Sequence, residues 1–240
     1  MKNNKEIFII EELSDLAIDN EKSPFSAKVR EIWLQYSTEN PILNNGQMVS
    51  LKYPNNVKDK IFDYFQKILT EFIEDENRLN ECFEIKNKYI MHIDNVNNTN
   101  KYVRTIFDVI VSMDRVNKYI WNISKILVDN IESYEGYIAW QRKTINISEK
   151  VRVEWNLIYN IRNIIEHPEN LTTTFFKRRG ENSEIPQIIY KEKEYDLFEL
   201  GMKSLQCVYI FLETIIGASF LYSKYIVAFT DETRTKLFKN

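Results

Sequence analysis

The chain has 240 residues, of which 44% are hydrophobic and 13% aromatic, enough for a self-sufficient globular core. Five glycines and five prolines are too few for the many turns of an all-β protein, so a mainly α fold is expected. The net charge of -3 excludes a protein that holds duplex nucleic acid through an overall basic surface, and any nucleic-acid contact must be local.

Sulfur and imidazole side chains are too few for a zinc or iron-sulfur cluster within one chain. Cys82 and Cys207 lie far apart without CxxC spacing, and the chain has two histidines. We therefore expect buried free thiols in a reducing cytoplasm, with no metal and no other cofactor. The N-terminus shows no secretory signal, and the apolar stretch 208–229 is interrupted by Glu213 and Lys224, so a core helix is expected there and no membrane partner.

Residues 1–56 are predicted to form an N-terminal region of two short helices and a loop. Apolar residues recur at helical intervals over 6–19 and 24–36, and Ser23 and Pro24 are typical of a helix start. The stretch 40–56 is rich in proline and asparagine and is expected to be a loop with a short strand at 48–53.

Residues 57–240 are predicted to form a helical bundle that makes one compact unit with the N-terminal region. Apolar stripes with steps of three and four define long helices over 57–93 and 102–131, which the asparagine-rich segment 95–100 should join into an antiparallel hairpin. Residues 133–147 have aromatic side chains without a clean period and are interpreted as an irregular connection.

A further helix is predicted over 151–167, where Pro168 ends it. The β-prone segments 172–176 and 188–190 flank a turn and indicate a hairpin. The last helix, 196–227, is apolar on nearly every side and should lie at the centre. The sequence thus predicts an up-down helical bundle with a small β-hairpin inserted before the C-terminal helix.

The helix over 151–167 carries Arg162, Asn163 and His167. A helical wheel assigns Val153 to the apolar arc and places Arg162 on the exposed polar arc, roughly 140° from His167. A single helix therefore does not aim both side chains at one phosphate. Either Pro168 frees His167 to turn toward the arginine, or two copies of the helix face each other across a two-fold axis.

The run Arg162-Asn163-x3-His167 resembles the motif of the HEPN superfamily, helical-bundle domains whose mark is an arginine, a polar residue and, a few residues later, a histidine. Its place on a late helix behind a long helical hairpin extends the resemblance. The resemblance implies a metal-independent endoribonuclease that works as a homodimer through the motif helix, often in toxin-antitoxin or phage-defence systems. Members paired with a nucleotidyltransferase antitoxin have a tyrosine two residues after the histidine. Here that residue is Glu169, which argues against that antitoxin as the partner.

Within this resemblance each motif residue has a chemical role. His167 would accept the proton of the ribose 2'-hydroxyl or protonate the 5'-oxygen, and Arg162 would stabilise charge on phosphorus. Asn163 would bind phosphate or fix the imidazole. Glu166 could orient Arg162 or His167 but could equally face solvent. Tyr159, which the wheel places on the exposed arc together with Trp155, could support the site or a partner surface.

Other interpretations remain open. Lys177, Arg178 and Arg179 could grip RNA phosphates, although a basic cluster at a hairpin tip is commonly only solvated. His92 has no second metal ligand nearby and is interpreted as a structural or surface residue. The motif could also belong to a non-catalytic nucleotide-binding or RNA-binding bundle, or to a helical interaction module. The sequence does not name an RNA target.

Overall fold

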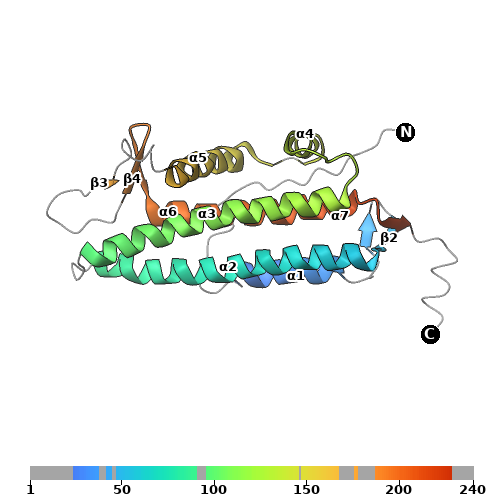
Figure 1. Ribbon diagram of the computed structural model, residues 1–240, viewed down its shortest axis with the longest axis horizontal. Coiled ribbons are helices and arrows are strands. Elements are labelled where there is room, and N and C mark those ends of the chain that lie inside the picture. The colour runs from blue at the N-terminus through green and yellow to red at the C-terminus, as the bar shows by residue number, and fades with distance from the viewer. Residues whose placement is uncertain are drawn as a thin grey trace.

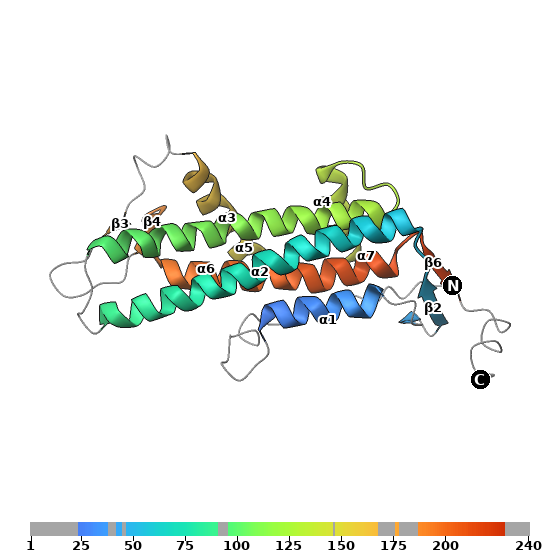
Figure 2. The same ribbon diagram turned by 60° about the horizontal axis from the view of Figure 1, so that its bottom comes forward.

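The computed structural model describes residues 24–37, 42–44, 47–90, 96–145, 147–167, 176–177 and 187–228. The helix expected over 6–19 lies outside the described residues. The helices form an elongated, mainly α bundle with small sheets at its two ends (Figures 1 and 2). The fold class predicted from the sequence is therefore confirmed.

Two long helices, α2 (Asn55–Ile90) and α3 (Val96–Leu127), run antiparallel along the bundle, as predicted (Figure 2). Their contact is an apolar stripe with helical spacing, which includes the fully buried Ile68, Phe72 and Ile106. The asparagine-rich stretch 95–100 was expected to turn the chain, but α3 already begins at Val96. Asparagine is favoured both at helix starts and in turns, so the asparagines of this stretch could not show which of these two structures it forms.

The centre of the bundle is one continuous helical rod made of α6 (Leu197–Phe211), the π-helical turn η3 (Leu212–Ile216) and α7 (Gly217–Leu221). Between Gly201 and Phe220 the only exposed residue is Glu213. This rod is long and apolar enough to cross a membrane. However, 83% of its most apolar 18-residue stretch is buried in the bundle. Such burial is expected of a core helix, as the sequence indicated.

The rod ends earlier than its apolar pattern predicted. The helix stops at Leu221, and the chain continues into the strand β6 (Ile226–Ala228) instead of remaining helical to residue 227. The amide of Lys224 donates to the carbonyl of Leu127, and the amide of Lys52 donates to the carbonyl of Tyr225. Tertiary hydrogen bonding thus overrides helical periodicity at this end.

At this end of the bundle, β6 completes a three-stranded antiparallel sheet with β1 (Ile42–Asn44) and β2 (Gln47–Leu51), in the order β1-β2-β6. The strand predicted over 48–53 corresponds to β2, while β1 and β6 were not predicted. The N-terminal region and the C-terminal part of the chain therefore share one sheet.

A second sheet lies at the opposite end and contains the predicted hairpin (Figure 1). In this sheet β4 (Gln187–Tyr190) lies in the middle and pairs antiparallel with both β3 (Phe176–Lys177) and β5 (Lys193–Asp196). The connection 178–186 lies outside the described residues. The β4–β5 turn was missed because it uses Lys191 and Glu192 with φ of 50° and 64°, a backbone region in which glycine or asparagine is expected.

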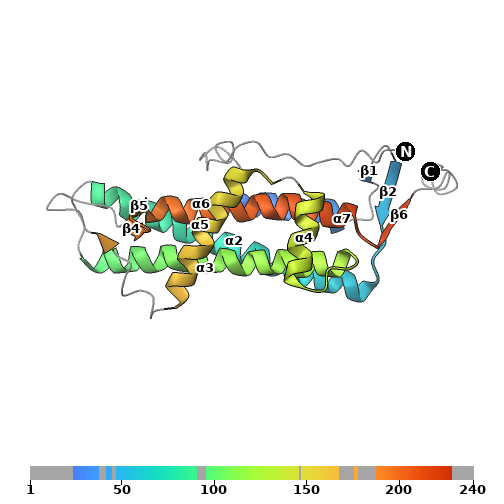
Figure 3. The same ribbon diagram turned by 90° about the horizontal axis from the view of Figure 1, so that it is seen from above.

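Three shorter helices cover the bundle. α1 (Phe25–Ser37) packs beside α2, and α5 (Glu149–Glu166) lies across α3 and α6, whereas α4 (Tyr134–Thr144) packs on α3 nearer to α7 (Figure 3). The segment that contains α4 was expected to be irregular, and that prediction is wrong. The Ser133 side chain caps α4 by accepting from the Gly136 amide at 3.1 Å, a local interaction that outweighs the weak periodicity.

A carboxylate is buried on the side of α2 that faces the core. The side chain of Asp75 on α2 is fully buried, and its Oδ1 lies 2.5 Å from Arg78 Nη1. Burial raises the pKa of Asp75 to about 6, although hydrogen bonds from Ser112 and Arg78 act in the opposite direction. The folded protein therefore binds a proton at this group more tightly than the unfolded chain.

We expect this carboxylate to make the free energy of unfolding depend on pH. Between pH 4 and pH 6 folded Asp75 keeps a proton that the unfolded chain releases, so stability falls as pH rises through this range. The difference between the ordinary aspartate pKa of 3.8 and the value of about 6 in the folded protein corresponds to a change of at most about 3 kcal/mol in the free energy of unfolding. Urea unfolding from pH 4 to pH 7 should show the fall in the wild type and in Asp63→Asn, an exposed control on the same helix. Asp75→Asn should lack it, and an unchanged slope in that variant would contradict the assignment.

Candidate functional site

The helix α5 is placed by caps at both ends. The Ser148 hydroxyl accepts from the Val151 amide at 3.3 Å, and His167 is the C-cap with φ -117° and ψ 83°. His167 is thus outside helical geometry, as the following Pro168 predicted. Pro168 itself lies outside the described residues.

Arg162 does not lie on the exposed arc where the helical wheel placed it. Its side chain is only 14% exposed and reaches toward α3, where Nη2 lies 3.0 Å from Asp114 Oδ2. The same Nη2 lies 2.5 Å from Glu166 Oε2, and Nη1 donates to Asn163 Oδ1 at 2.9 Å. Of the two alternatives for Glu166, the structure therefore shows contact with Arg162. The wheel erred because it gives the direction of Cβ, whereas a long arginine side chain can bend to a buried charge.

Asp114 is the residue of this site that sequence reasoning missed. Its side chain is 5% exposed, and Lys118 Nζ on the same helix lies 2.9 Å from Oδ2. Two cations thus neutralise Asp114 Oδ2, whereas Arg162 Nε is buried without a hydrogen bond to a described residue. The signal was present in the sequence, because a carboxylate within the apolar stripe of α3 requires a buried counter-charge.

His167 and Tyr159 have different surroundings from Arg162. The His167 side chain is exposed at the end of α5, and the Tyr159 side chain is 43% exposed one turn before Arg162. Arg162 faces inward toward Asp114. Arg162 and His167 thus differ in burial, and both alternatives for bringing them to one phosphate stay predictions.

Two further expectations about α5 are wrong. Val153, assigned to the apolar arc, is 57% exposed. Trp155, assigned to the exposed arc, is half-buried with its ring edge-on to Phe211 of α6, at 5.5 Å between centroids. Because α5 crosses α3 and α6 at an angle, its buried arc is rotated from the one that hydrophobicity alone indicated (Figure 3).

The basic cluster after α5 is only partly described. Lys177 belongs to the strand β3, while Arg178 and Arg179 lie outside the described residues. Their contact with RNA remains a prediction.

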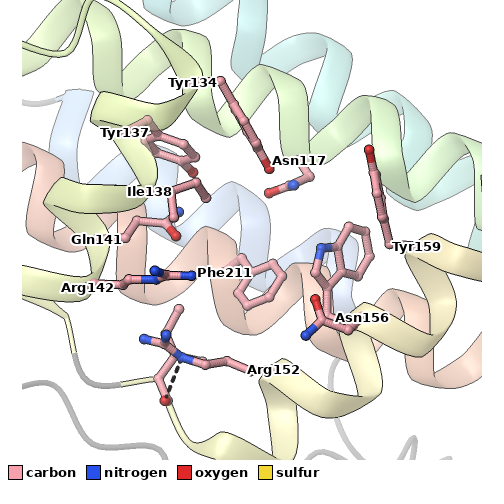
Figure 4. Close-up of a pocket in the computed structure, with 12 residues that line it drawn as sticks. Asn117, Tyr134, Tyr137, Ile138, Gln141, Arg142, Arg152, Asn156, Tyr159 and Phe211 are labelled. Carbon is pink, nitrogen blue, oxygen red and sulfur yellow. Dashed lines mark hydrogen bonds between the residues drawn. The ribbon is translucent and has the colours of Figure 1, made fainter.

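A pocket of about 250 Å³ lies beside the motif, between α3, α4, α5 and α6 (Figure 4). Arg142 of α4 and Arg152, Trp155 and Tyr159 of α5 line it, and Figure 4 shows Tyr159 on the side away from Arg142. No carboxylate lines this pocket. Sequence reasoning missed the pocket because α4, which supplies one wall, was not recognised as a helix.

The described residues contain no group of three or more histidine, cysteine, aspartate or glutamate side chains placed to hold a metal ion. Cys82 and Cys207 are buried free thiols, and burial raises the pKa of each to about 12. No protein-family model, curated protein or solved structure matches the chain.

We expect the Arg162–Asp114 ion pair to stabilise the docking of α5. Arg162→Met should lower the free energy of unfolding by about 3 kcal/mol, because it leaves the Asp114 carboxylate buried with one cation fewer. The double variant Arg162→Met/Asp114→Leu should lose less free energy of unfolding than the two single variants lose together. The difference, measured by urea unfolding, should be about 1 kcal/mol or more.

Lys203→Met is the matched control for this cycle. It removes the ion pairs of Lys203 with Glu154 of α5 at 3.3 Å and with Glu199 of α6 at 3.1 Å, which are more exposed and should each contribute less than about 1 kcal/mol. Additive losses for Arg162 and Asp114 would contradict the coupling.

Proposed function

We propose that the protein is a metal-independent endoribonuclease of the HEPN type, with a site built from Arg162, Asn163 and His167. The observation that carries the proposal is the polar cluster at the end of α5. There Asp114 and Glu166 hold the Arg162 guanidinium in place, and a non-helical backbone leaves the His167 side chain exposed. A guanidinium fixed by carboxylates and an exposed imidazole on the same helix end are the groups that phosphodiester chemistry uses.

The reaction would be an attack of the ribose 2'-oxygen on the adjacent phosphorus. His167 accepts the 2'-hydroxyl proton while the new oxygen–phosphorus bond forms. The bond to the 5'-oxygen then breaks, and a protonated imidazole supplies the proton for that oxygen. The products are a 2',3'-cyclic phosphate and a 5'-hydroxyl, and Arg162 with Asn163 stabilises the phosphorane oxygens.

A homodimer through α5 would complete this site. Within one copy Arg162 faces inward and His167 is exposed, so one copy does not present both side chains on the same outer surface. Two α5 helices related by a two-fold axis would provide two histidines, one for each proton transfer. A cytoplasmic role in phage defence or with an antitoxin protein belongs to the same proposal, because it follows from the family resemblance.

The second candidate is a non-catalytic nucleotide-binding or RNA-binding module, or a helical interaction module. The observation in its favour is that two carboxylates already neutralise Arg162 in the single copy. In this case the motif arginine stabilises the docking of α5, and any ligand binds without being cleaved.

We expect His167→Ala to lower RNA cleavage by about a thousand-fold, because it removes the general acid–base group. The measurement is the cleavage of varied single-stranded RNAs in excess EDTA, with the 2',3'-cyclic phosphate detected by mass spectrometry. His92→Ala is the matched control, since it removes the other histidine of the chain, and it should cleave at the wild-type rate. If the wild type leaves all substrates intact and its expression never harms the host, the ribonuclease proposal fails and binding without cleavage favours the second candidate.

We expect a charge on the exposed side of α5 to weaken the dimer and cleavage together. Asn160→Arg places like charges across the two-fold axis and should raise the dimer dissociation constant at least about ten-fold. Light scattering after size exclusion, over a range of concentrations, measures this change. Asn56→Arg, at an exposed position of α2, is the control. Full cleavage by a wild-type monomer would overturn the composite site.

A further inference from the structure

The pocket between α4 and α5 lies beside the motif but does not contain Arg162 or His167. Its charged lining residues are Arg142 and Arg152, and none of its lining residues is acidic. In a chain of net charge -3, this is a local concentration of positive charge at a concave surface. The pocket therefore favours an anionic ligand.

The two guanidinium groups are available to a ligand. Arg152 Nε donates to the carbonyl of Ile147 at 3.2 Å, and this contact fixes the side chain. It does not use the two terminal nitrogens of the guanidinium, which can therefore donate to a ligand. Arg142 is exposed and extends into the pocket toward Phe211 (Figure 4). Neither arginine forms an ion pair with a described residue. Two unneutralised guanidinium groups on one side of a small pocket match the oxygen atoms of a phosphate.

The opposite side of the pocket suits a flat heterocycle. Tyr159 of α5 lies there (Figure 4), and Trp155 of α5, which is held edge-on against Phe211, is a second aromatic ring of the lining. The carboxamides of Asn117 and Asn156 also line the pocket, and such groups pair with the donor and acceptor atoms of a base edge. Aromatic rings and carboxamides together are the usual surroundings of an unstacked base.

A buried hydroxyl lies at the α4 wall of the pocket, close to the Gln141 side chain. Tyr137 is fully buried and its hydroxyl makes no hydrogen bond of normal geometry with any described residue, although Gln141 is close enough to lower its pKa. Burial raises that pKa, so the hydroxyl stays protonated and can donate. The cavity of about 250 Å³ is smaller than the roughly 300–1,000 Å³ of most ligand sites, so its ligand is no larger than one nucleotide unit and stays partly exposed to solvent.

We infer that this pocket binds one nucleoside monophosphate unit, with the phosphate at Arg142 and Arg152 and the base at Trp155. The unit is either a free mononucleotide or one nucleotide of single-stranded RNA, since both present the same chemistry. This site goes beyond the proposed cleavage, because its residues are distinct from the motif and binding requires no reaction.

The test measures binding of AMP, GMP, CMP and UMP by calorimetry, with quenching of tryptophan fluorescence as a second readout. At least one mononucleotide should bind, and the matching nucleoside should bind about ten-fold more weakly because it lacks the phosphate. Arg142→Gln should weaken nucleotide binding about ten-fold without loss of folding, since the side chain is exposed. Arg104→Gln, at an exposed position of α3 outside the pocket, should bind like the wild type.

Competition with a short single-stranded RNA distinguishes the two sources. If the RNA displaces the mononucleotide and Arg142→Gln weakens both, the pocket holds a nucleotide of RNA. If the RNA does not compete, the pocket serves a free nucleotide. His167→Ala should bind the mononucleotide with unchanged affinity even where cleavage is lost, so failure of the ribonuclease proposal would leave this result intact. Absence of binding by all four mononucleotides at millimolar concentration, or equal binding by Arg142→Gln, would overturn the inference.

Discussion

The arrangement of the bundle depends on the burial of the rod Leu197–Leu221. A helix that is apolar on nearly every side is stable in water only when other elements cover its whole circumference. The α2–α3 hairpin covers most of it, and α1, α4 and α5 cover the remainder. At Gly201 a Cβ atom would lie 3.0 Å from Leu79 Cδ2, so glycine lets the rod approach α2 closely. The helices are thus positioned by the need to enclose one segment near the C-terminal end of the sequence.

The helix α5 carries the candidate site, and the Arg162 guanidinium of that site also holds α5 against α3. Arg162 is held by Asp114 of α3 and by Glu166 of α5. A phosphate that engages this guanidinium must approach two carboxylates or displace them, and both approaches cost free energy. In the proposed function, RNA affinity would therefore be linked to the local stability of α5, because the same ion pairs would contribute to both.

Sequence periodicity predicted the long helices because each buries one regular apolar stripe, as in α2 and α3. It failed where a single contact decides the structure. The cap formed by Ser133 starts α4 despite a weak pattern, and pairing with β2 turns residues 226–228 into a strand within an apolar stretch. For the site, the motif gave the residues but not their surroundings. The inward turn of Arg162 depends on Asp114, 48 positions earlier in the sequence, a contact that spacing along one helix does not encode.

The position of α4 has a consequence for how this protein can diversify. It lies across the outside of the bundle and contributes one buried side chain, Tyr137, to the core, while Arg142 and Gln141 line the pocket. Changes at these two positions alter the charge and shape of the pocket without opening a void around the central rod. Phe211 of the rod is buried, so core packing restricts its replacement, whereas Arg142 is exposed and free of this restriction. If the pocket binds a nucleotide as inferred, substitutions in α4 would change its ligand preference with little loss of folding stability.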